Sequence, residues 1–155
     1  MRGKRAPKRN INPDAKYQSI TIAKFINQVM RQGKKSTAEK VVYAALEILK
    51  EKTKKEPLEI FDAAIKNVSP DVEVKSRRIG GGNYQIPVAV MGERKMALAF
   101  RWILEAARKR KGAAMSKRLA DELLAAYNRE GAAIKKREDT YRMAEANRVF
   151  AHFIR

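Results

Sequence analysis

The chain has 155 residues, and its 35 Lys and Arg against 17 Asp and Glu give a formal net charge of +18. A chain of this length with 45% apolar residues can bury a core of its own, which excludes a disordered polycation and a scaffold that depends on disulfides or metals. Because it has no cysteine and only one histidine, His152, we expect no metal site, no catalytic residues and no cofactor.

The first ten residues carry five cations and no acid, which is typical of a flexible basic arm that becomes ordered on a partner; we expect this arm to extend to residue 12. No apolar stretch follows it, and the longest apolar run covers only residues 41–46, whereas a membrane span needs about 20. The sequence therefore predicts no signal peptide, no membrane helix and a cytoplasmic location.

Three helices are predicted next. Apolar residues spaced as on one helical face predict the first over residues 22–30. Ser36 and Glu39 have the spacing of a capping box, which predicts that a second helix begins there and reaches about Lys52. Pro57 suits the first turn of a third helix. Proline has no backbone N–H, and in the first turn that group has no hydrogen-bond partner within the helix anyway.

The periodicity then changes from 3.6 to 2. Two alternating runs within residues 72–90 flank the glycines at 80–82, which predicts a β-hairpin. Pro87 cannot donate to a strand ladder, so its strand must present an edge there, and no third strand is predicted elsewhere. We therefore expect the hairpin to protrude as an arm from a helical body.

Three further helices follow the hairpin. The fourth is predicted from Met96 to the cations before Gly112, the fifth begins at Ser116 as its cap, and the sixth runs from Ile134 into the segment that holds Phe150. The expected fold class is mostly α. One domain, residues 1–155, would contain a bundle of six helices, with the two-stranded hairpin protruding between the third and fourth.

The charge is unevenly distributed along the chain. Between residues 36 and 73 six basic residues stand against eight acidic ones, a net of −2, so the remainder carries +20. A neutral stretch within so basic a chain indicates that the excess cations form a surface for a partner, and a polyanion is the obvious candidate.

Five groups of cations are candidates for this surface. One group consists of three cations on the strand before the glycines, and Tyr84 across the turn can stack on a base. The alternative, that cations on an edge strand only prevent aggregation, stays open. The groups are Arg2, Lys4, Arg5, Lys8 and Arg9; Lys75, Arg77 and Arg78; Arg94 and Lys95; Arg108, Lys109, Arg110 and Lys111 with Lys117 and Arg118; and Lys135, Lys136 and Arg137 with Arg142. Lys34 and Lys35 are further candidates for phosphate contacts.

Three stretches resemble one known family: VEVKSRRIGGGNYQIPV at 72–88, RWILEAARKR at 101–110, and KKRED with RMAEANRVFAH between 135 and 152. With these motifs and a similar length, the whole chain resembles the bacterial family of ribosomal protein seven of the small subunit. The resemblance implies the same six helices with a hairpin between the third and fourth, and a protein without enzymatic activity.

The resemblance also implies a function. Members of this family bind small-subunit rRNA as primary binders and nucleate folding of its 3′ major domain into the head of the subunit. Their hairpin lies on the interface side near the messenger and the exit-site tRNA, with ribosomal proteins nine and eleven as neighbours. Some members repress translation of their own messenger. No membrane and no small-molecule substrate is implied.

Site residues can be carried over from the family to matching positions of this sequence. The rRNA-binding set would comprise the cations Arg2, Lys4, Arg5, Lys8, Arg9, Lys34, Lys35, Lys75, Arg77, Arg78, Arg94, Lys95, Arg108, Lys109, Arg110, Lys111, Lys135, Lys136, Arg137 and Arg142, with Met115 and Met143. Near the tRNA and messenger would lie Arg78, Gly80, Gly81, Gly82, Asn83 and Tyr84, and a protein contact would involve Arg148 and Phe150.

Other function classes fit the residues less well. An architectural DNA-binding protein with the basic ribbon as a minor-groove arm is the alternative, since it needs the same charges. An RNA-modifying enzyme would need a cofactor loop or an acid–base pair; residues 33–36 depart from the phosphate-loop pattern, and capping or solvation explains adjacent acids such as Asp121 and Glu122. Adhesion to an anionic membrane would need a helix with an openly apolar face.

Overall fold

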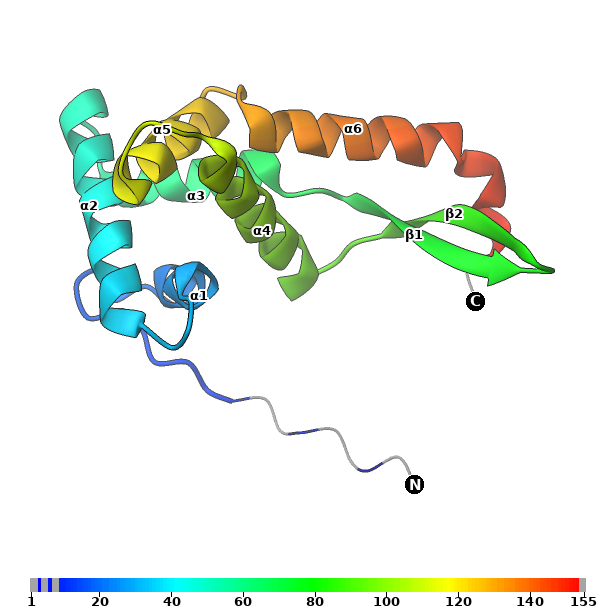
Figure 1. Ribbon diagram of the computed structural model, residues 1–155, viewed down its shortest axis with the longest axis horizontal. Coiled ribbons are helices and arrows are strands. Elements are labelled where there is room, and N and C mark those ends of the chain that lie inside the picture. The colour runs from blue at the N-terminus through cyan, green and yellow to red at the C-terminus, as the bar shows by residue number, and fades with distance from the viewer. Residues whose placement is uncertain (1–2, 4–5, 7–8, 154–155) are drawn as a thin grey trace. The chain divides into compact units, whose positions relative to one another are not determined.

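A computed structural model describes residues 3, 6 and 9–153 (Figure 1). They fall into two compact units, Met1–Lys40 and Val41–Arg155, so the single domain over residues 1–155 stays a prediction. The elements are α1 (Ile20–Val29), α2 (Lys35–Thr53), α3 (Pro57–Val68), β1 (Val72–Ile79), β2 (Gly82–Ala89), α4 (Glu93–Lys109), α5 (Met115–Tyr127), α6 (Ala132–Ala146) and the 3-10 helix η1 (Arg148–Phe153). Within the described residues, the mostly helical class with six α-helices and a hairpin between the third and fourth is confirmed.

The helix boundaries correct three details of the sequence analysis. α2 begins at Lys35 and α5 at Met115, so Ser36 and Ser116 lie inside their helices and are not the N-cap residues. α6 ends at Ala146, and both the backbone N–H (3.1 Å) and the side-chain amide (2.8 Å) of the C-cap residue Asn147 donate to the Met143 carbonyl. The segment that holds Phe150 is therefore a separate 3-10 helix and not the end of the sixth helix.

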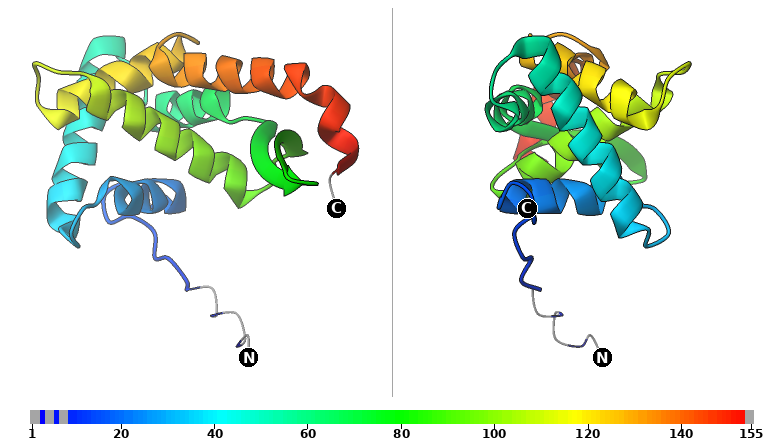
Figure 2. Two further views of the ribbon diagram at one scale, coloured as in Figure 1. Left: turned by 45° about the vertical axis from the view of Figure 1, so that its right-hand side comes forward. Right: turned by 90° about the vertical axis from the view of Figure 1, so that its left-hand side faces the viewer.

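In the unit Val41–Arg155, helices α3, α4, α5 and α6 pack against one another, and the left view of Figure 2 shows α4 and α6 side by side. Their apolar faces meet in a core where Phe61, Ile103, Leu119 and Leu123 are fully buried. The rings of Phe61 and Phe100 add a tilted aromatic pair with centroids 6.4 Å apart. This core fixes α4 and α6, which carry five and four basic residues.

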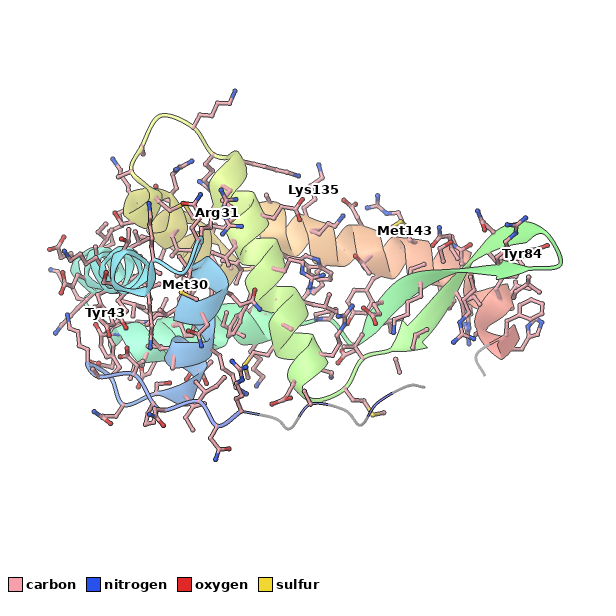
Figure 3. All side chains as sticks on the ribbon, turned by 60° about the horizontal axis from the view of Figure 1, so that its bottom comes forward. Met30, Arg31, Tyr43, Tyr84, Lys135 and Met143 are labelled. Carbon is pink, nitrogen blue, oxygen red and sulfur yellow. The ribbon has the colours of Figure 1, made fainter. Side chains whose placement is uncertain are left out.

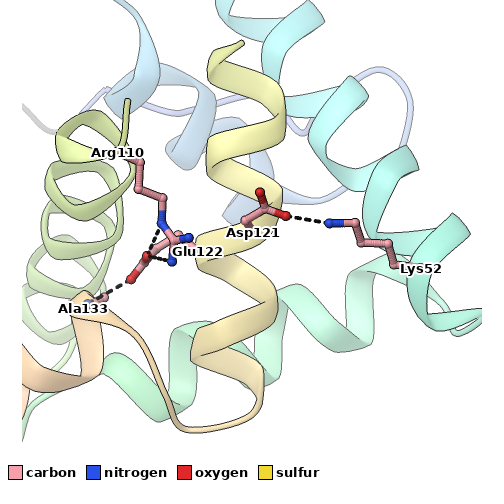
Figure 4. A network of polar contacts seen from close by, with 5 residues as sticks. All are labelled: Lys52, Arg110, Asp121, Glu122 and Ala133. Atoms are coloured by element: carbon pink, nitrogen blue, oxygen red, sulfur yellow. Dashed lines mark hydrogen bonds and ion pairs between the residues drawn. The ribbon is translucent and has the colours of Figure 1, made fainter. Parts of the chain in front are cut away.

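The carboxylate of Glu122, on α5, is fully buried and joins three elements (Figure 4). One oxygen accepts hydrogen bonds of 2.6 and 3.0 Å from the guanidinium of Arg110, the residue that follows α4. The other oxygen accepts 2.9 Å from the backbone N–H of Ala133, in the first turn of α6. A buried carboxylate is tolerated only when its oxygens are paired and hydrogen-bonded. Glu122 therefore sets where α4 ends and α6 begins.

The turn before α6 is shaped around this carboxylate. Gly131 has φ +94°, and a Cβ on it would lie 3.0 Å from the Cβ of Ala125 and 3.1 Å from Oε1 of Glu122. Glycine is needed there for both the left-handed backbone and the close approach. The neighbouring Asp121 points away and pairs with Lys52 of α2 at 2.5 Å, so the two adjacent acids have different roles.

The predicted hairpin is present, and its two strands are joined by a two-residue turn. Arg77 pairs with Tyr84 and Ile79 with Gly82, and both turn residues, Gly80 and Gly81, have positive φ, as the tight turns of β-hairpins require. The arm is not isolated, because α6 packs along both strands and η1 packs against β2 (Figures 1 and 2). The expected protruding hairpin thus extends from the helices with α6 and η1 beside it.

The base of the hairpin is held by Asp71. Its side chain accepts hydrogen bonds from Lys95 of α4 and, at 3.1 Å, from the Tyr141 hydroxyl of α6. Its backbone N–H donates to the same hydroxyl (2.9 Å), and its carbonyl accepts from the Val90 N–H (2.8 Å). The hydrogen bonds from Lys95 and Tyr141 and the charge of Lys95 lower the pKa of the Asp71 carboxyl below its ordinary value.

Glu73, the second residue of β1, holds the base of the hairpin in the same way. Its buried side chain accepts bonds of 2.9 and 3.2 Å from Arg94 of α4 and lies 2.9 Å from the Lys75 ammonium. Burial opposes ionisation, but the hydrogen bonds and charges of Arg94 and Lys75 outweigh it, so the pKa of Glu73 is lowered. At this point of β1 the glutamate is buried and the neighbouring valines are only half-buried, because ion pairing draws Glu73 inward.

We expect the substitution Glu122→Ala to lower the free energy of unfolding by about 2–4 kcal/mol, because the Ala133 N–H loses its partner and a cavity remains. Urea unfolding followed by circular dichroism measures this loss. The matched control is Glu130→Ala, which removes an exposed carboxylate of the same connection and should change stability by no more than about 0.5 kcal/mol. Equal losses in the two variants would contradict the role given to Glu122.

The substitution Glu73→Gln should lower the free energy of unfolding by about 1 kcal/mol at neutral pH, a modest loss because Arg94 and Lys75 are half exposed. A carboxyl whose pKa is lowered by folding stabilises above its ordinary pKa, and this contribution disappears as the pH falls through the folded-state value. The gap between wild type and variant should therefore narrow from about pH 5 to about pH 3. Glu51→Gln, at an exposed position of α2, should show no such narrowing.

Candidate nucleic-acid interface

The predicted cations of the first unit are exposed where they are described. Arg9, Lys34 and Lys35 are exposed, and Lys35 makes only a loose pair with Glu39 at 3.9 Å. The loop before α2 places Gln32 and Gly33 at positive φ, which turns the chain sharply. Four cations of the basic arm, Arg2, Lys4, Arg5 and Lys8, lie outside the described residues.

The hairpin presents a cationic distal half. Arg77 and Arg78 are exposed on β1, opposite Tyr84 and Asn83, whereas Lys75 is drawn to Glu73. No heavy atom lies within 4 Å of a Cβ built at either turn glycine, so the turn backbone is open to close approach. A two-stranded ribbon with an open turn and cations beside it fits a nucleic-acid groove.

Several cations of the predicted rRNA-binding set make contacts within the protein. Arg94 and Lys95 pair with Glu73 and Asp71, and these contacts help to lower the pKa values of both carboxyls. Arg110 is bound to Glu122. The guanidinium of Arg118 donates to the carbonyls of Arg110 (2.6 Å) and Arg108 (3.4 Å), where the last carbonyls of α4 lack helical partners.

Arg137 also has a structural contact. It is half-buried on α6, and its guanidinium donates to the backbone carbonyl of Asn67 at the end of α3. The Asn67 side chain in turn donates to the carbonyls of Ala126 and Tyr127, both at 3.0 Å. These bonds tie α3, α5 and α6 together, so the guanidinium edge that faces Asn67 is not available to a phosphate.

A groove of about 290 Å³ lies between α4 and α6. It is lined by Trp102, Glu105, Ala106, Lys109, Ala132, Lys135, Lys136 and Asp139. Lys135 and Lys136 are exposed at its rim, and Figure 3 shows Lys135 on α6 next to α4. Lys109 is paired with Glu105 at 3.2 Å across one exposed helical turn, a pair of little energetic value. The ammonium groups of this groove can therefore turn toward an external phosphate.

Sequence reasoning missed Arg101. It is exposed on α4, two helical turns after Arg94 and two before Arg108. The seven-residue spacing of these arginines was the available signal, because residues seven apart lie on one face of a helix. The position was overlooked because it lies among the apolar residues that define the buried face of the same helix.

The remaining α6 and η1 residues have mixed surroundings. Arg142 is exposed and 3.6 Å from Asp139, and Met143 is 46% exposed further along α6 toward the hairpin (Figure 3). Arg148 lies 3.6 Å from Glu145. Phe150, predicted to contact a protein, packs its ring 5.2 Å from that of Tyr84, predicted to lie near tRNA. The structure thus brings together two residues that the sequence assigned to separate contacts.

Among residues 3, 6 and 9–153, no group of three His, Asp or Glu is placed to hold a metal ion. None of the helices in this described part is both long and apolar enough to span a bilayer. Exposed guanidinium and ammonium groups on the hairpin, α4 and α6 are the functional chemistry that the surface offers.

Comparison with known proteins identifies the family. A family model described as Ribosomal protein S7p/S5e matches residues 1–148. The small ribosomal subunit protein uS7 of Thermotoga petrophila is 56% identical over 153 residues, which is 99% of each chain. That of Acidithiobacillus ferrooxidans is 57% identical over 152 residues, 98% of this chain and 97% of its own. The chain therefore belongs to the ribosomal protein S7p/S5e family, and it is a non-enzymatic, structural, RNA-binding constituent of the small subunit of the cytoplasmic ribosome.

Proposed function

We propose that this chain is a primary rRNA-binding protein that nucleates folding of the 3′ major domain of small-subunit rRNA into the head. The observation that carries the proposal is a set of exposed cations that form no ion pair within the described residues. On the hairpin, α4, the loop after it and α6 these are Arg78, Arg101, Lys111, Lys135 and Lys136. Because they are exposed and unneutralised, they can reduce the repulsion between RNA helices that must come together.

The fold supplies the second part of this mechanism. Arg110, Arg118 and Arg137 are bound to groups of the protein itself, which holds the helices in one arrangement. A fixed array of cations favours the one RNA arrangement whose phosphates match it, because phosphate contacts set register and orientation without reading sequence. Nucleation of an RNA domain follows if the protein binds that arrangement better than the alternatives.

We further propose that the hairpin lies at the subunit interface near the messenger and the exit-site tRNA, with ribosomal proteins nine and eleven as neighbours. The open glycine turn beside Arg78 supports an approach to RNA backbone, and the 75% exposed Val149 supports a protein neighbour close by. Binding to its own messenger, and so repression of its translation, would use the same cations on a similar RNA shape.

A salt titration of binding to the isolated 3′ major domain tests the electrostatic mechanism. If about eight phosphates are neutralised, the logarithm of affinity should fall with the logarithm of salt concentration with a slope of about −6 to −7. A flat response would contradict the mechanism. Competition with duplex DNA of equal length tests the alternative, an architectural DNA-binding protein. A preference for DNA over rRNA would favour that alternative.

Removing exposed cations of α4 and α6 should weaken binding to different RNA sequences by a similar factor, because phosphate contacts do not read sequence. We expect the triple variant Arg101→Ala, Lys135→Ala, Lys136→Ala to reduce the magnitude of the salt slope by about 2–3. The matched control, Lys50→Ala, Lys54→Ala, Lys66→Ala, removes the same charge from exposed positions of α2, α3 and the loop between them, within the neutral stretch. It should leave the slope nearly unchanged, and an equal effect of both variants would show that net charge alone determines binding.

A further inference from the structure

The distal half of the hairpin lies beyond the polar contacts that hold its base. Asp71 and Glu73 hold only the base, whereas each strand has eight residues, about 25 Å of extended chain. A two-stranded ribbon is marginally stable on its own and bends easily. Arg78, next to the turn, would therefore sample many positions if the base were the sole attachment.

A second attachment lies near the turn. The ring of Tyr84 packs against two aromatic rings of η1, with centroids 5.2 Å from Phe150 and 6.1 Å from Phe153. Phe150 and Phe153 are 6.4 Å apart, and His152 adds its ring 4.0 Å from that of Phe153. Aromatic pairs within this range of distances attract one another beyond the area they bury.

The hairpin backbone accommodates this aromatic cluster. The Tyr84 ring lies over Gly82, where a Cβ would be only 3.0 Å from Cε2 of the ring. A side chain at residue 82 would require the Tyr84 ring to shift. At the other side, Asn147 ends α6 and allows η1 to turn back along β2, as Figure 1 shows. Both partners are thus shaped for the contact.

We propose that η1 positions the hairpin, and that Phe150 is a positioning residue for RNA binding by the distal arm. The inference rests on the proposed function of the hairpin as an RNA-binding arm. By packing on Tyr84, which is opposite Arg77 in the register, Phe150 holds the strand that carries Arg78 at one angle to α6. An arm that is already in its binding position loses less conformational entropy when it binds RNA. Phe150 can therefore raise the affinity for RNA without contacting the RNA itself.

This role differs from the protein contact that the sequence suggested for Phe150. Its ring is half-buried against the hairpin of the same chain, so it is engaged before any partner arrives. The adjacent Val149 is 75% exposed, and no ring contact involves it. Val149 is therefore the matched control, since it lies on the same 3-10 helix but outside the aromatic cluster.

Distance measurements on the RNA-free protein test the positioning directly. Because the natural chain has no cysteine, spin labels can be attached at Gln85→Cys on β2 and Glu138→Cys on α6, both exposed positions. We expect one narrow distance distribution, unchanged by Val149→Ala, clearly broadened by Phe150→Ala, and narrow again with Phe150→Tyr, which keeps the ring. A broad distribution in the unsubstituted background, or a narrow one with Phe150→Ala, would overturn the proposal.

Binding to the isolated rRNA domain supplies the functional readout. Phe150→Ala should weaken affinity by about two- to twelvefold, the range expected for the loss of one aromatic pair. In a double-mutant cycle with Arg78→Ala, the loss from Phe150→Ala should largely disappear, because the arm has then lost the cation that it positions. Additive losses would overturn the proposal. Failure of the unsubstituted protein to bind rRNA would refute the proposed function, while the RNA-free distances would still report on positioning.

Discussion

The buried carboxylate of Glu122 is the interaction on which the basic surface of the Val41–Arg155 unit depends. It accepts from Arg110 at the end of α4 and from Ala133 at the start of α6, so it sets the relation of these two helices. Their relation defines the groove where Lys135 and Lys136 lie. α6 then runs along the hairpin, and the 3-10 helix after it reaches Tyr84. The position of the arm is therefore linked to a junction at the far end of α6.

Opposite charges divide the cations of this protein into two groups. Where a carboxylate or a free carbonyl is near, as for Arg94, Arg110 and Arg137, the cation stabilises the fold. Where the cation forms no ion pair within the described residues, as for Arg78 and Lys136, it is exposed to solvent. The separation is useful for an RNA-binding constituent of a ribosomal subunit, because the first group makes rigid the array that the second presents.

Periodicity and turn chemistry predicted the element order well. The change of period after the third helix and the glycines before Asn83 were sufficient for the hairpin, since strand alternation and a tight turn are local properties. The serines chosen as caps were wrong by two residues, because α2 begins at Lys35 and α5 begins at Met115 after Ala114, an N-cap residue with no side-chain hydrogen bond, and local spacing does not show this. Arg101 was missed because its neighbours in the sequence, Phe100 and Trp102, belong to the buried face of α4, whereas Arg101 lies on the exposed face.

The sequence by itself determined the class of this protein, a mostly helical, strongly basic chain with a hairpin, because composition and period follow directly from the residues. Tertiary structure alone decided which cations are available and what the aromatic residues do. The side chain of Arg137 donates to a carbonyl 70 residues earlier in the chain. The ring of Tyr84, in the middle of the chain, packs against that of Phe150 near the C-terminus. Such contacts depend on how distant helices pack, and no local pattern of residues specifies them.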